Sequence, residues 1–149
     1  MFNDPSSGET VQLQNSLLSD NLASAFNSFV GYYFVPDDCA GSLTSLDYNL
    51  VSHLTAGCTF LASPHDRLNA APHLGSLADN GGPTWTQALL PGSPAIDAGN
   101  PGGCTNPLGA LLTKDQRGFP RPAFGGHSFR CDIGAYELQQ LGFLPLLTK

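Results

Sequence analysis

Glycine and proline punctuate this chain along its whole length, and no other feature constrains its fold as much. The 149 residues include 17 glycines and 12 prolines, whereas only 12% of the residues are charged. Glycine and proline form tight turns, and a shortage of charged residues argues against exposed amphipathic helices. Because 41% of the residues are hydrophobic, the composition is not that of a disordered protein. We therefore predict a single turn-rich, all-β domain with a core.

Two segments combine short apolar runs with an asparagine at a corner. VQLQNSLLSDN (residues 11–21) turns at Asn15, and SLTSLDYNLVSHLTAGCTFL (residues 42–61) turns at Asn49. A weak repeat of short strands broken at Asn, Ser and Gly is typical of a β-solenoid, in which each coil packs on the next. The fold predicted from this pattern is a short right-handed parallel β-helix. The alternative, an antiparallel sandwich, would need clearer two-residue hairpin signals.

A rigid turn and a last strand precede a loop-rich end of the chain. ADNGGPT (residues 78–84) is a strong turn signal, and TWTQALL (residues 84–90) reads as a strand with Trp85 and either Ala88 or Leu89 facing inward. We accordingly divide the chain into β-helix coils (residues 1–92), a C-terminal cap (residues 93–137) and a tail (residues 138–149).

Four cysteines form two pairs that are local in sequence, and no Cys-x-x-Cys spacing for a metal or redox site occurs. Of the three connectivities that four cysteines allow, we prefer Cys39–Cys58 and Cys104–Cys131. Free buried thiols in a reducing compartment are the alternative.

The motifs from residue 73 onward resemble a known family. HLGSLADNGGPTWTQALLPGSPAIDAGNP (residues 73–101) is followed by DQRGFPRP (residues 115–122) and CDIGAYE (residues 131–137). This order of motifs resembles the C-terminal part of choice-of-anchor Q domain proteins, which are bacterial surface or secreted β-helix proteins of pectate-lyase-like architecture. The resemblance implies final coils and a cap, and it brings no catalytic residue set. Since the chain has no signal peptide and no evident anchor after Glu137, we expect a fragment or a miniature member.

Four carboxylates of this region are the candidate catalytic residues: Asp97, Asp115, Asp132 and Glu137. Glycosidases use two carboxylates that flank the sugar bond. The alternative for Asp97 is structural, with its carboxylate accepting backbone N–H groups of the turn at residues 98–100 or pairing with an arginine. We favour the structural role because the neighbours of Asp97 are small.

Arginines and aromatic residues are the candidate ligand-binding side chains. Arg117 and Arg121 suit an anionic sugar such as a uronate, because guanidinium groups bind carboxylates bidentately. We favour an internal role, in which they pair with Asp97 or Asp132 and Phe119 closes the core. In FNSFVGYYF (residues 26–34), Tyr32 and Tyr33 are candidates for an exposed platform that stacks on sugars, which the sequence leaves open, whereas we expect the phenylalanines (Phe26, Phe29 and Phe34) to pack in the core or cover its open end.

Calcium is the one cofactor that the sequence suggests, and we expect none. Asp37, Asp38 and Asp47 are hard oxygen ligands, but no EF-hand loop or metal-binding His or Cys spacing occurs. Ordinary loop acids are the preferred interpretation, and the same holds for His65 next to Asp66.

Charge and hydropathy limit the partners. A net charge of −6 with only 6 basic residues argues against nucleic acid. No apolar run is long enough to span a membrane, and the first ten residues carry no secretion signal. The low lysine content and many small polar residues indicate an extracellular or cell-surface protein. The exposed edge of the first coil predicts self-association.

We therefore predict a non-catalytic extracellular module for surface display, adhesion or carbohydrate contact. One alternative is a glycoside hydrolase or polysaccharide lyase that uses the C-terminal carboxylates, an idea based on fold analogy. The other is a purely structural solenoid cap.

Overall fold

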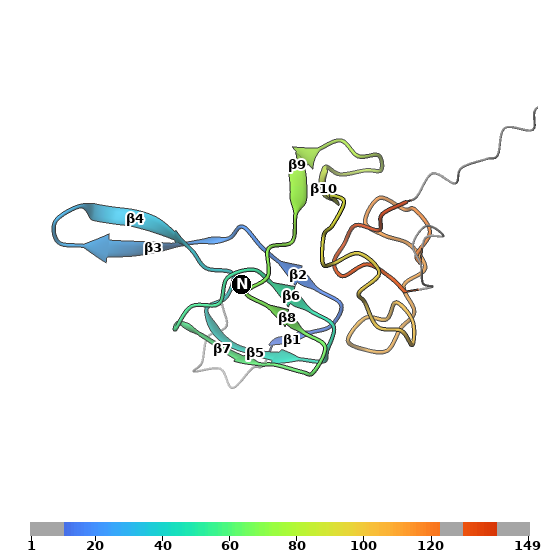
Figure 1. Ribbon diagram of the computed structural model, residues 1–149, viewed down its shortest axis with the longest axis horizontal. Coiled ribbons are helices and arrows are strands. Elements are labelled where there is room, and N and C mark those ends of the chain that lie inside the picture. Colours follow the sequence, from blue (N-terminus) through green and yellow to red (C-terminus); the bar gives the residue numbers. More distant parts are fainter. Residues whose placement is uncertain (1–10, 123–129, 140–149) are drawn as a thin grey trace, which may run out of the picture.

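The computed structural model describes residues 11–122 and 130–139, and they form an all-β fold, as predicted (Figure 1). The strands are short, and the longest have six residues. In chain order they are β1 (Val11–Leu13), β2 (Leu17–Leu18), β3 (Leu22–Asn27), β4 (Gly31–Pro36), β5 (Gly41–Ser45), β6 (Leu50–Val51), β7 (Cys58–Leu61), β8 (Arg67–Leu68), β9 (Leu74–Ala78) and β10 (Thr86–Leu89).

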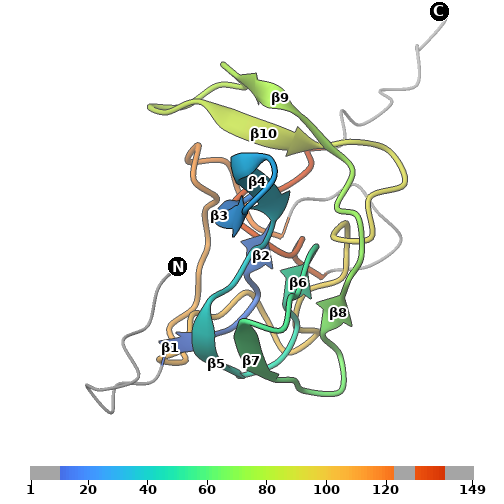
Figure 2. The same ribbon diagram turned by 90° about the vertical axis from the view of Figure 1, so that its left-hand side faces the viewer.

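Two parallel three-stranded sheets form the body of the molecule. Their strand orders are β1-β5-β7 and β2-β6-β8, and Figure 2 shows the two stacks next to each other. In the second sheet Leu50 of the central strand pairs with Leu17 on one side and with Arg67 on the other. Leu43, Leu50 and Val51 are fully buried, so the central strands supply the core.

Polar side chains stack at the corner between the two sheets. Oδ1 of Asn49 accepts the backbone N–H of Ser16 at 3.0 Å, and Oδ1 of Asp66 accepts the backbone N–H of Asn49 at 2.8 Å. The amide of Asn49 also donates to the carbonyl of Leu13 at 3.1 Å. Asn49 is thus a corner residue, as its sequence context predicts, and its partner in the stack is Ser16.

The prediction of a right-handed parallel β-helix is wrong. The described residues form four separate sheets of three or two strands, and two of them are antiparallel hairpins, β3-β4 and β9-β10. The β3-β4 hairpin is inserted between the first and second layers of the parallel sheets, and the chain leaves the stack after β8. Parallel pairing therefore ends after three strands in each sheet.

Several aromatic residues also lie elsewhere than predicted. Trp85 is 65% exposed, whereas Thr86 and Leu89 of β10 are the buried residues of that strand. The phenylalanines of residues 26–34 are all exposed and do not pack in the core. Phe119 is 39% exposed and lies against the guanidinium of Arg117, outside the two hydrophobic clusters of the described residues.

Both predicted disulfides are present, Cys39–Cys58 and Cys104–Cys131. The first joins the segment after the β3-β4 hairpin to β7, and the second joins two loops of the C-terminal segment. Two disulfides are consistent with an extracellular or otherwise oxidising environment.

The C-terminal segment completes the core without regular strands. Its described part contains only isolated bridges, and it contributes Ala95, Ala98 and Ile133 to a cluster with Leu50 and Leu89. It also covers the first corner, because the N–H of Gly134 donates to the carbonyl of Asn15 at 2.9 Å. Most of the predicted tail lies outside the described residues. The first ten residues, whose sequence carries no secretion signal, also lie outside them. The outer edge of β1, where self-association is predicted, has no strand partner within the described residues.

Candidate functional site

The C-terminal segment gathers the predicted carboxylates and arginines into one buried network. We call it the C-terminal network, and its members are Asp115, Arg117, Arg121, Asp132 and Glu137. Four of them are buried residues, and the side chain of Arg121 is 6% exposed. The sequence motifs DQRGFPRP and CDIGAYE therefore meet in space.

Asp115 and Arg117 form the first pair of this network. Nε and Nη2 of Arg117 donate to Oδ2 of Asp115 at 2.9 and 2.7 Å. Oδ1 of Asp115 accepts the backbone N–H groups of Arg117 and Phe119. Burial alone would raise the pKa of Asp115, but these hydrogen bonds and one from the N–H of Glu137 outweigh it and hold the pKa below its ordinary value. Asp115 is a charged acceptor that closes its own turn.

The guanidinium of Arg117 is enclosed by two aromatic rings and two backbone carbonyls. Its Cζ lies 3.6 Å from the ring centroid of Tyr136 and 4.6 Å from that of Phe119. Nη2 donates to the carbonyl of Glu137 at 2.6 Å, and Nη1 donates to the carbonyl of Asn80 at 3.2 Å. A ligand would have to break these contacts to reach the guanidinium, so Arg117 has an internal role.

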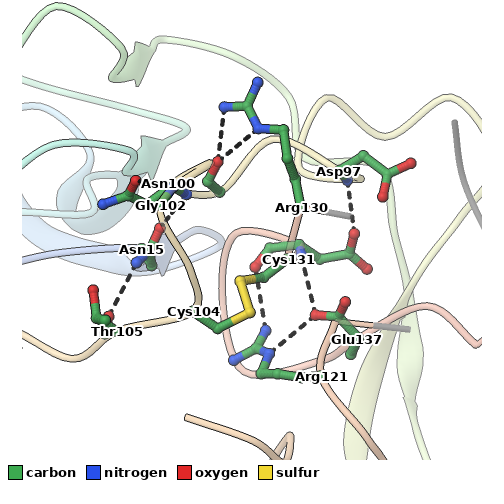
Figure 3. Close-up of a disulfide and its surroundings, with 12 residues drawn as sticks. Asn15, Asp97, Asn100, Gly102, Cys104, Thr105, Arg121, Arg130, Cys131 and Glu137 are labelled. Carbon is green, nitrogen blue, oxygen red and sulfur yellow. Dashed lines mark hydrogen bonds and ion pairs between the residues drawn. A yellow bond between two sulfur atoms is a disulfide. The ribbon is translucent and has the colours of Figure 1, made fainter. Parts of the chain in front are cut away.

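Arg121 ties Glu137 to the loop that follows Cys131 (Figure 3). Its Nε donates to Oε2 of Glu137 at 3.0 Å, and its Nη2 donates to the carbonyls of Asp132 and Gly134 at 3.2 and 2.7 Å. From the sequence we expected the arginines to pair with the carboxylates of Asp97 or Asp132. The carboxylates that pair with them are those of Asp115 and Glu137, and Asp132 contributes only its carbonyl.

Among the described residues, the carboxylate of Asp132 accepts hydrogen bonds from backbone groups alone. Oδ1 accepts the N–H of Asp97 at 2.7 Å, and Oδ2 accepts the N–H of Leu138 at 2.6 Å. Burial, together with the negative charges of Glu137 and Asp97, raises the pKa of Asp132 to about 6, against the opposing effect of the two hydrogen bonds.

Asp97 does not fill the role that we expected for it. Its backbone is left-handed, with φ of 51°, and its carboxylate accepts no hydrogen bond and forms no ion pair with the described residues. Figure 3 shows this carboxylate pointing away from Arg121 and Glu137. The turn is bound by other acceptors, because Oδ1 of Asn15 accepts the N–H of Asn100 at 2.9 Å and the carbonyl of Cys131 accepts the N–H of Gly99 at 2.8 Å.

The network is arranged to hold loops together. Asp115, Asp132 and Glu137 are buried and bound to donors of the protein itself. Two nearby cavities, of 170 and 420 Å³, have no carboxylate among their described lining residues. Glycoside hydrolysis needs two carboxylates that face the substrate. The network offers no such pair to a ligand.

A second candidate site is the β3-β4 hairpin, which we call the arm. Figure 1 shows it projecting from the body on the side away from the C-terminal loops. Residues directly opposite each other on antiparallel strands share a face. Since Leu22 pairs with Pro36, Ser24 with Phe34 and Phe26 with Tyr32, one face carries a row of large side chains. We call it the aromatic face, and its large members are Leu22, Phe26, Tyr32 and Phe34.

The aromatic face is open to solvent. The exposed fractions of its large residues are 63% for Leu22, 65% for Phe26, 82% for Tyr32 and 72% for Phe34. The ring centroids of Phe26 and Tyr32 lie 5.1 Å apart, with the rings tilted by 60°. Tyr33 is 42% exposed and lies on the opposite face, next to Ala25. The predicted pair Tyr32 and Tyr33 therefore does not form one platform, because neighbouring residues of a strand point to opposite faces.

Sequence reasoning missed Phe26 and Phe34 as surface residues. The available signal was the hairpin itself, since Asn27 and Gly31 bracket a three-residue loop between two alternating segments. Glycine in the left-handed conformation is typical of the end of such loops, and Gly31 has φ of 80°. Because β3 and β4 pair only with each other, the large side chains of the hairpin are exposed to solvent.

The three acids considered as calcium ligands, Asp37, Asp38 and Asp47, do not converge. In residues 11–122 and 130–139 no three His, Cys, Asp or Glu side chains are grouped as a metal site. Asp38 is buried and accepts hydrogen bonds from Asn21, Ser52 and His53. Asp47 instead contacts His65, with Oδ2 and Nδ1 at 2.6 Å.

Comparisons with protein family models, curated proteins and solved structures found no match for this chain. Within the described parts of the chain, no helix is long and apolar enough to cross a membrane. Function is therefore argued from the geometry of the arm and of the C-terminal segment.

Proposed function

We propose that this protein is a non-catalytic extracellular module that binds neutral polysaccharide through the aromatic face of the arm. The observation that carries this proposal is the row of three aromatic rings and Leu22 on one side of a projecting hairpin, each more than 60% exposed. Contiguous exposed apolar patches mark interaction sites. Aromatic side chains offer flat apolar faces against which the apolar faces of sugar rings pack.

The arm is suited to a neutral, extended ligand. Residues 21–36 contain no charged side chain, so the arm offers nothing to the phosphates of nucleic acids or to anionic lipids. Residues two apart on a strand are about 7 Å apart, which places Tyr32 and Phe34 in a row along the hairpin. A row of rings fits successive units of a polymer better than one compact molecule.

The base of the arm is held firmly. The backbone N–H and the amide of Asn21 donate to Oδ1 of Asp38 at 3.0 and 3.1 Å, and the N–H of Asp37 donates to the carbonyl of Asn21 at 3.0 Å. Cys39, which directly follows Asp38, forms a disulfide with Cys58. A fixed base reduces the ordering cost of binding.

Binding assays on neutral polysaccharides test the proposal. We would measure depletion of the protein by insoluble cellulose and its retardation by soluble β-glucan and mannan in native gels. The double substitution Phe26→Ala and Tyr32→Ala is expected to weaken binding at least tenfold. Trp85→Ala is the matched control, because Trp85 is also 65% exposed and lies outside the arm.

Three results would reject the proposal. One is binding that the double variant retains, and another is an equal loss in the Trp85→Ala control. The third is self-association that the double variant abolishes, without polysaccharide binding, because a second copy of the chain would then be the occupant. Melting temperatures of both variants, expected to match that of the unsubstituted protein, exclude misfolding as the cause of a loss.

The burial of the C-terminal carboxylates supports a non-catalytic role over a glycoside hydrolase or polysaccharide lyase. Release of reducing sugar from the same polysaccharides would favour the enzyme. Absence of both binding and release would favour a purely structural role.

We also propose that the C-terminal segment is related to choice-of-anchor Q domain proteins. The contacts among its motifs support this relation. The backbone N–H of Asp97 in SPAIDAG donates to the carboxylate of Asp132 in CDIGAYE, and the guanidinium of Arg121 in DQRGFPRP donates to the carboxylate of Glu137. Motifs that hold one another in this way are expected to occur together.

A further inference from the structure

A polar cavity lies on the side of the body where β8 meets the C-terminal segment. Its volume is 330 Å³, and its lining combines two arginines with an aromatic pair: Arg67, Arg130, Tyr48 and His65, with Pro64, Asp66 and Ala98 completing the wall. Ligand pockets start at about 300 Å³, so the cavity is of a size for a small molecule. It shares no residue with the arm.

Arg67 brings to this cavity a positive charge that has no ion-pair partner in the part of the chain that the structure describes. It pairs in register with buried Leu50 at the last strand of its sheet, and it is exposed. Its guanidinium donates no hydrogen bond and forms no ion pair with the described residues. The neighbouring Asp66 is already used, because its Oδ1 accepts both nitrogens of Asn49 and its Oδ2 accepts the N–H of Ser63.

Arg130 is the second cation, and the protein fixes its position. Its Nε and Nη2 donate to the carbonyl of Gly99 at 2.9 and 2.7 Å, and it directly precedes the disulfide-bonded Cys131. These contacts use one edge of the guanidinium and leave its charge without a carboxylate partner among the described residues. Two arginines that form no ion pair with the described residues thus line one cavity, together with Asp66, in a chain of net charge −6.

Tyr48 and His65 provide a flat wall. Their rings are stacked, with centroids 4.7 Å apart and an angle of 3° between planes, and Cζ of Arg130 lies 5.7 Å from the centroid of Tyr48. The backbone is left-handed at both Asp47 and Tyr48, with φ of 86° and 59°. Such conformations cost free energy and are common at functional sites. Here the strain brings Asp47 to His65 and Tyr48 to the cavity.

We propose that this cavity binds a carboxylate-bearing sugar residue between Arg67 and Arg130. Guanidinium groups bind carboxylates bidentately, and the two arginines supply the charge that a single carboxylate requires. The cavity is larger than a bare carboxylate, and the wall of Tyr48, His65 and Pro64 accommodates the ring. This site is independent of the proposed function, since it takes an anion whereas the arm takes a neutral chain.

Titration with three small probes tests the site. Ligand-observed NMR at low ionic strength would compare D-glucuronate with D-glucose, which lacks the carboxylate, and with acetate, which lacks the ring. We expect glucuronate to bind at least tenfold more tightly than either. Salt is expected to weaken this binding, because the charges are partly exposed.

Substitutions assign the binding to the two arginines. Arg67→Ala is expected to weaken glucuronate binding at least tenfold, and Arg130→Lys, which keeps the charge but loses the planar fork, several-fold. Lys114→Ala removes an exposed positive charge outside the cavity and is expected to change nothing. The double variant Phe26→Ala and Tyr32→Ala should bind glucuronate normally, so failure of this site and failure of the arm are distinguishable.

The proposal is overturned if glucose binds as tightly as glucuronate, if acetate does, or if Arg67→Ala leaves glucuronate binding intact. An equal loss in Lys114→Ala would also overturn it, because the effect would then come from net charge. Arg67 is exposed and makes no side-chain contact with the described polar groups, so Arg67→Ala is expected to fold and its melting temperature is the check.

Discussion

Asp132 accepts the backbone N–H of Asp97 through Oδ1 at 2.7 Å, although the two residues are 35 positions apart and both carry a carboxyl group. No cation of residues 11–122 or 130–139 forms an ion pair with Asp132. The second oxygen of Asp132 binds the N–H of Leu138, so one carboxylate holds two separate loops. Burial disfavours the charged form of this carboxylate more than the two N–H groups favour it, so the C-terminal segment is sensitive to pH.

Stability is expected to depend on the protonation of Asp132. Folding raises the pKa of this residue from 3.8 to about 6, so between these values the native state binds more protons than the unfolded chain. The stabilisation is complete below the lower value and is lost as the pH rises through about 6. The two values correspond to about 3 kcal/mol. In urea unfolding, the free energy of unfolding of the protein minus that of Asp132→Asn should fall as the pH rises from 4 to 7.

Asp20→Asn is the matched control for this experiment, because it removes one exposed carboxylate. The comparison with Asp132→Asn isolates one group, whereas the carboxylates with lowered pKa, such as Asp115, act in the opposite direction in both proteins. A stability difference that stays constant from pH 4 to pH 7 would show that burial of Asp132 does not raise its pKa.

Asp97→Asn is expected to be nearly neutral. The carboxylate of Asp97 accepts no hydrogen bond from the described residues, and asparagine tolerates the left-handed backbone at this position. The free energy of unfolding should change by less than about 0.5 kcal/mol. A loss of about 1.5–3 kcal/mol, typical of a hydrogen bond to a charged group, would restore the structural role that the sequence suggests for Asp97.

The contrast between Asn49 and Asn15 shows what local sequence can predict. The corner at Asn49, the all-β fold and both disulfide pairings follow from patterns within a few tens of residues. Asn15 instead binds the C-terminal segment, with its amide donating to the carbonyl of Thr105 at 3.0 Å. A contact across 90 positions leaves no trace in local periodicity. The side-chain oxygen of Asn15 accepts the N–H of Asn100 and so takes over the acceptor role that we expected for Asp97.

The arm and the parallel sheets explain the larger error in the fold. Alternating large residues read alike whether a strand is buried or exposed, so Phe26 and Phe34 were predicted inside. The corner asparagines indicate parallel strands that stack on one another, but a local pattern does not determine how many strands each parallel sheet contains. The arginine site at Arg67 and Arg130 also escaped prediction, because the two residues are brought together only by the fold.

Gly82→Ala is expected to destabilise the protein strongly. A Cβ at Gly82 would lie 2.5 Å from Cα and 2.7 Å from the carbonyl oxygen of Arg117, and φ of 89° strains any other residue. The clash is with backbone, so side-chain rotation does not relieve it. We expect a loss of about 2–5 kcal/mol in the free energy of unfolding.

Gly109→Ala separates the clash from the backbone strain. Gly109 has φ of 78°, and a Cβ there would meet nothing within 4 Å. Only the conformational cost remains, about 1–2 kcal/mol. Equal effects of the two substitutions in urea unfolding would mean that the turn carrying Gly82 does not pack on Arg117.

Removing the Cys104–Cys131 disulfide is expected to affect both stability and the cavity. A cross-link over 27 positions constrains the unfolded chain by about 3–4 kcal/mol, so Cys104→Ala with Cys131→Ala should lower stability by that amount. Because Arg130 directly precedes Cys131, the same variant should also bind glucuronate more weakly.

Cys39→Ala with Cys58→Ala is the control, since that disulfide closes a loop of 19 positions at the base of the arm. It should cost a similar free energy and leave glucuronate binding unchanged. Equal loss of glucuronate binding in both variants would mean that the disulfide next to Arg130 does not position it.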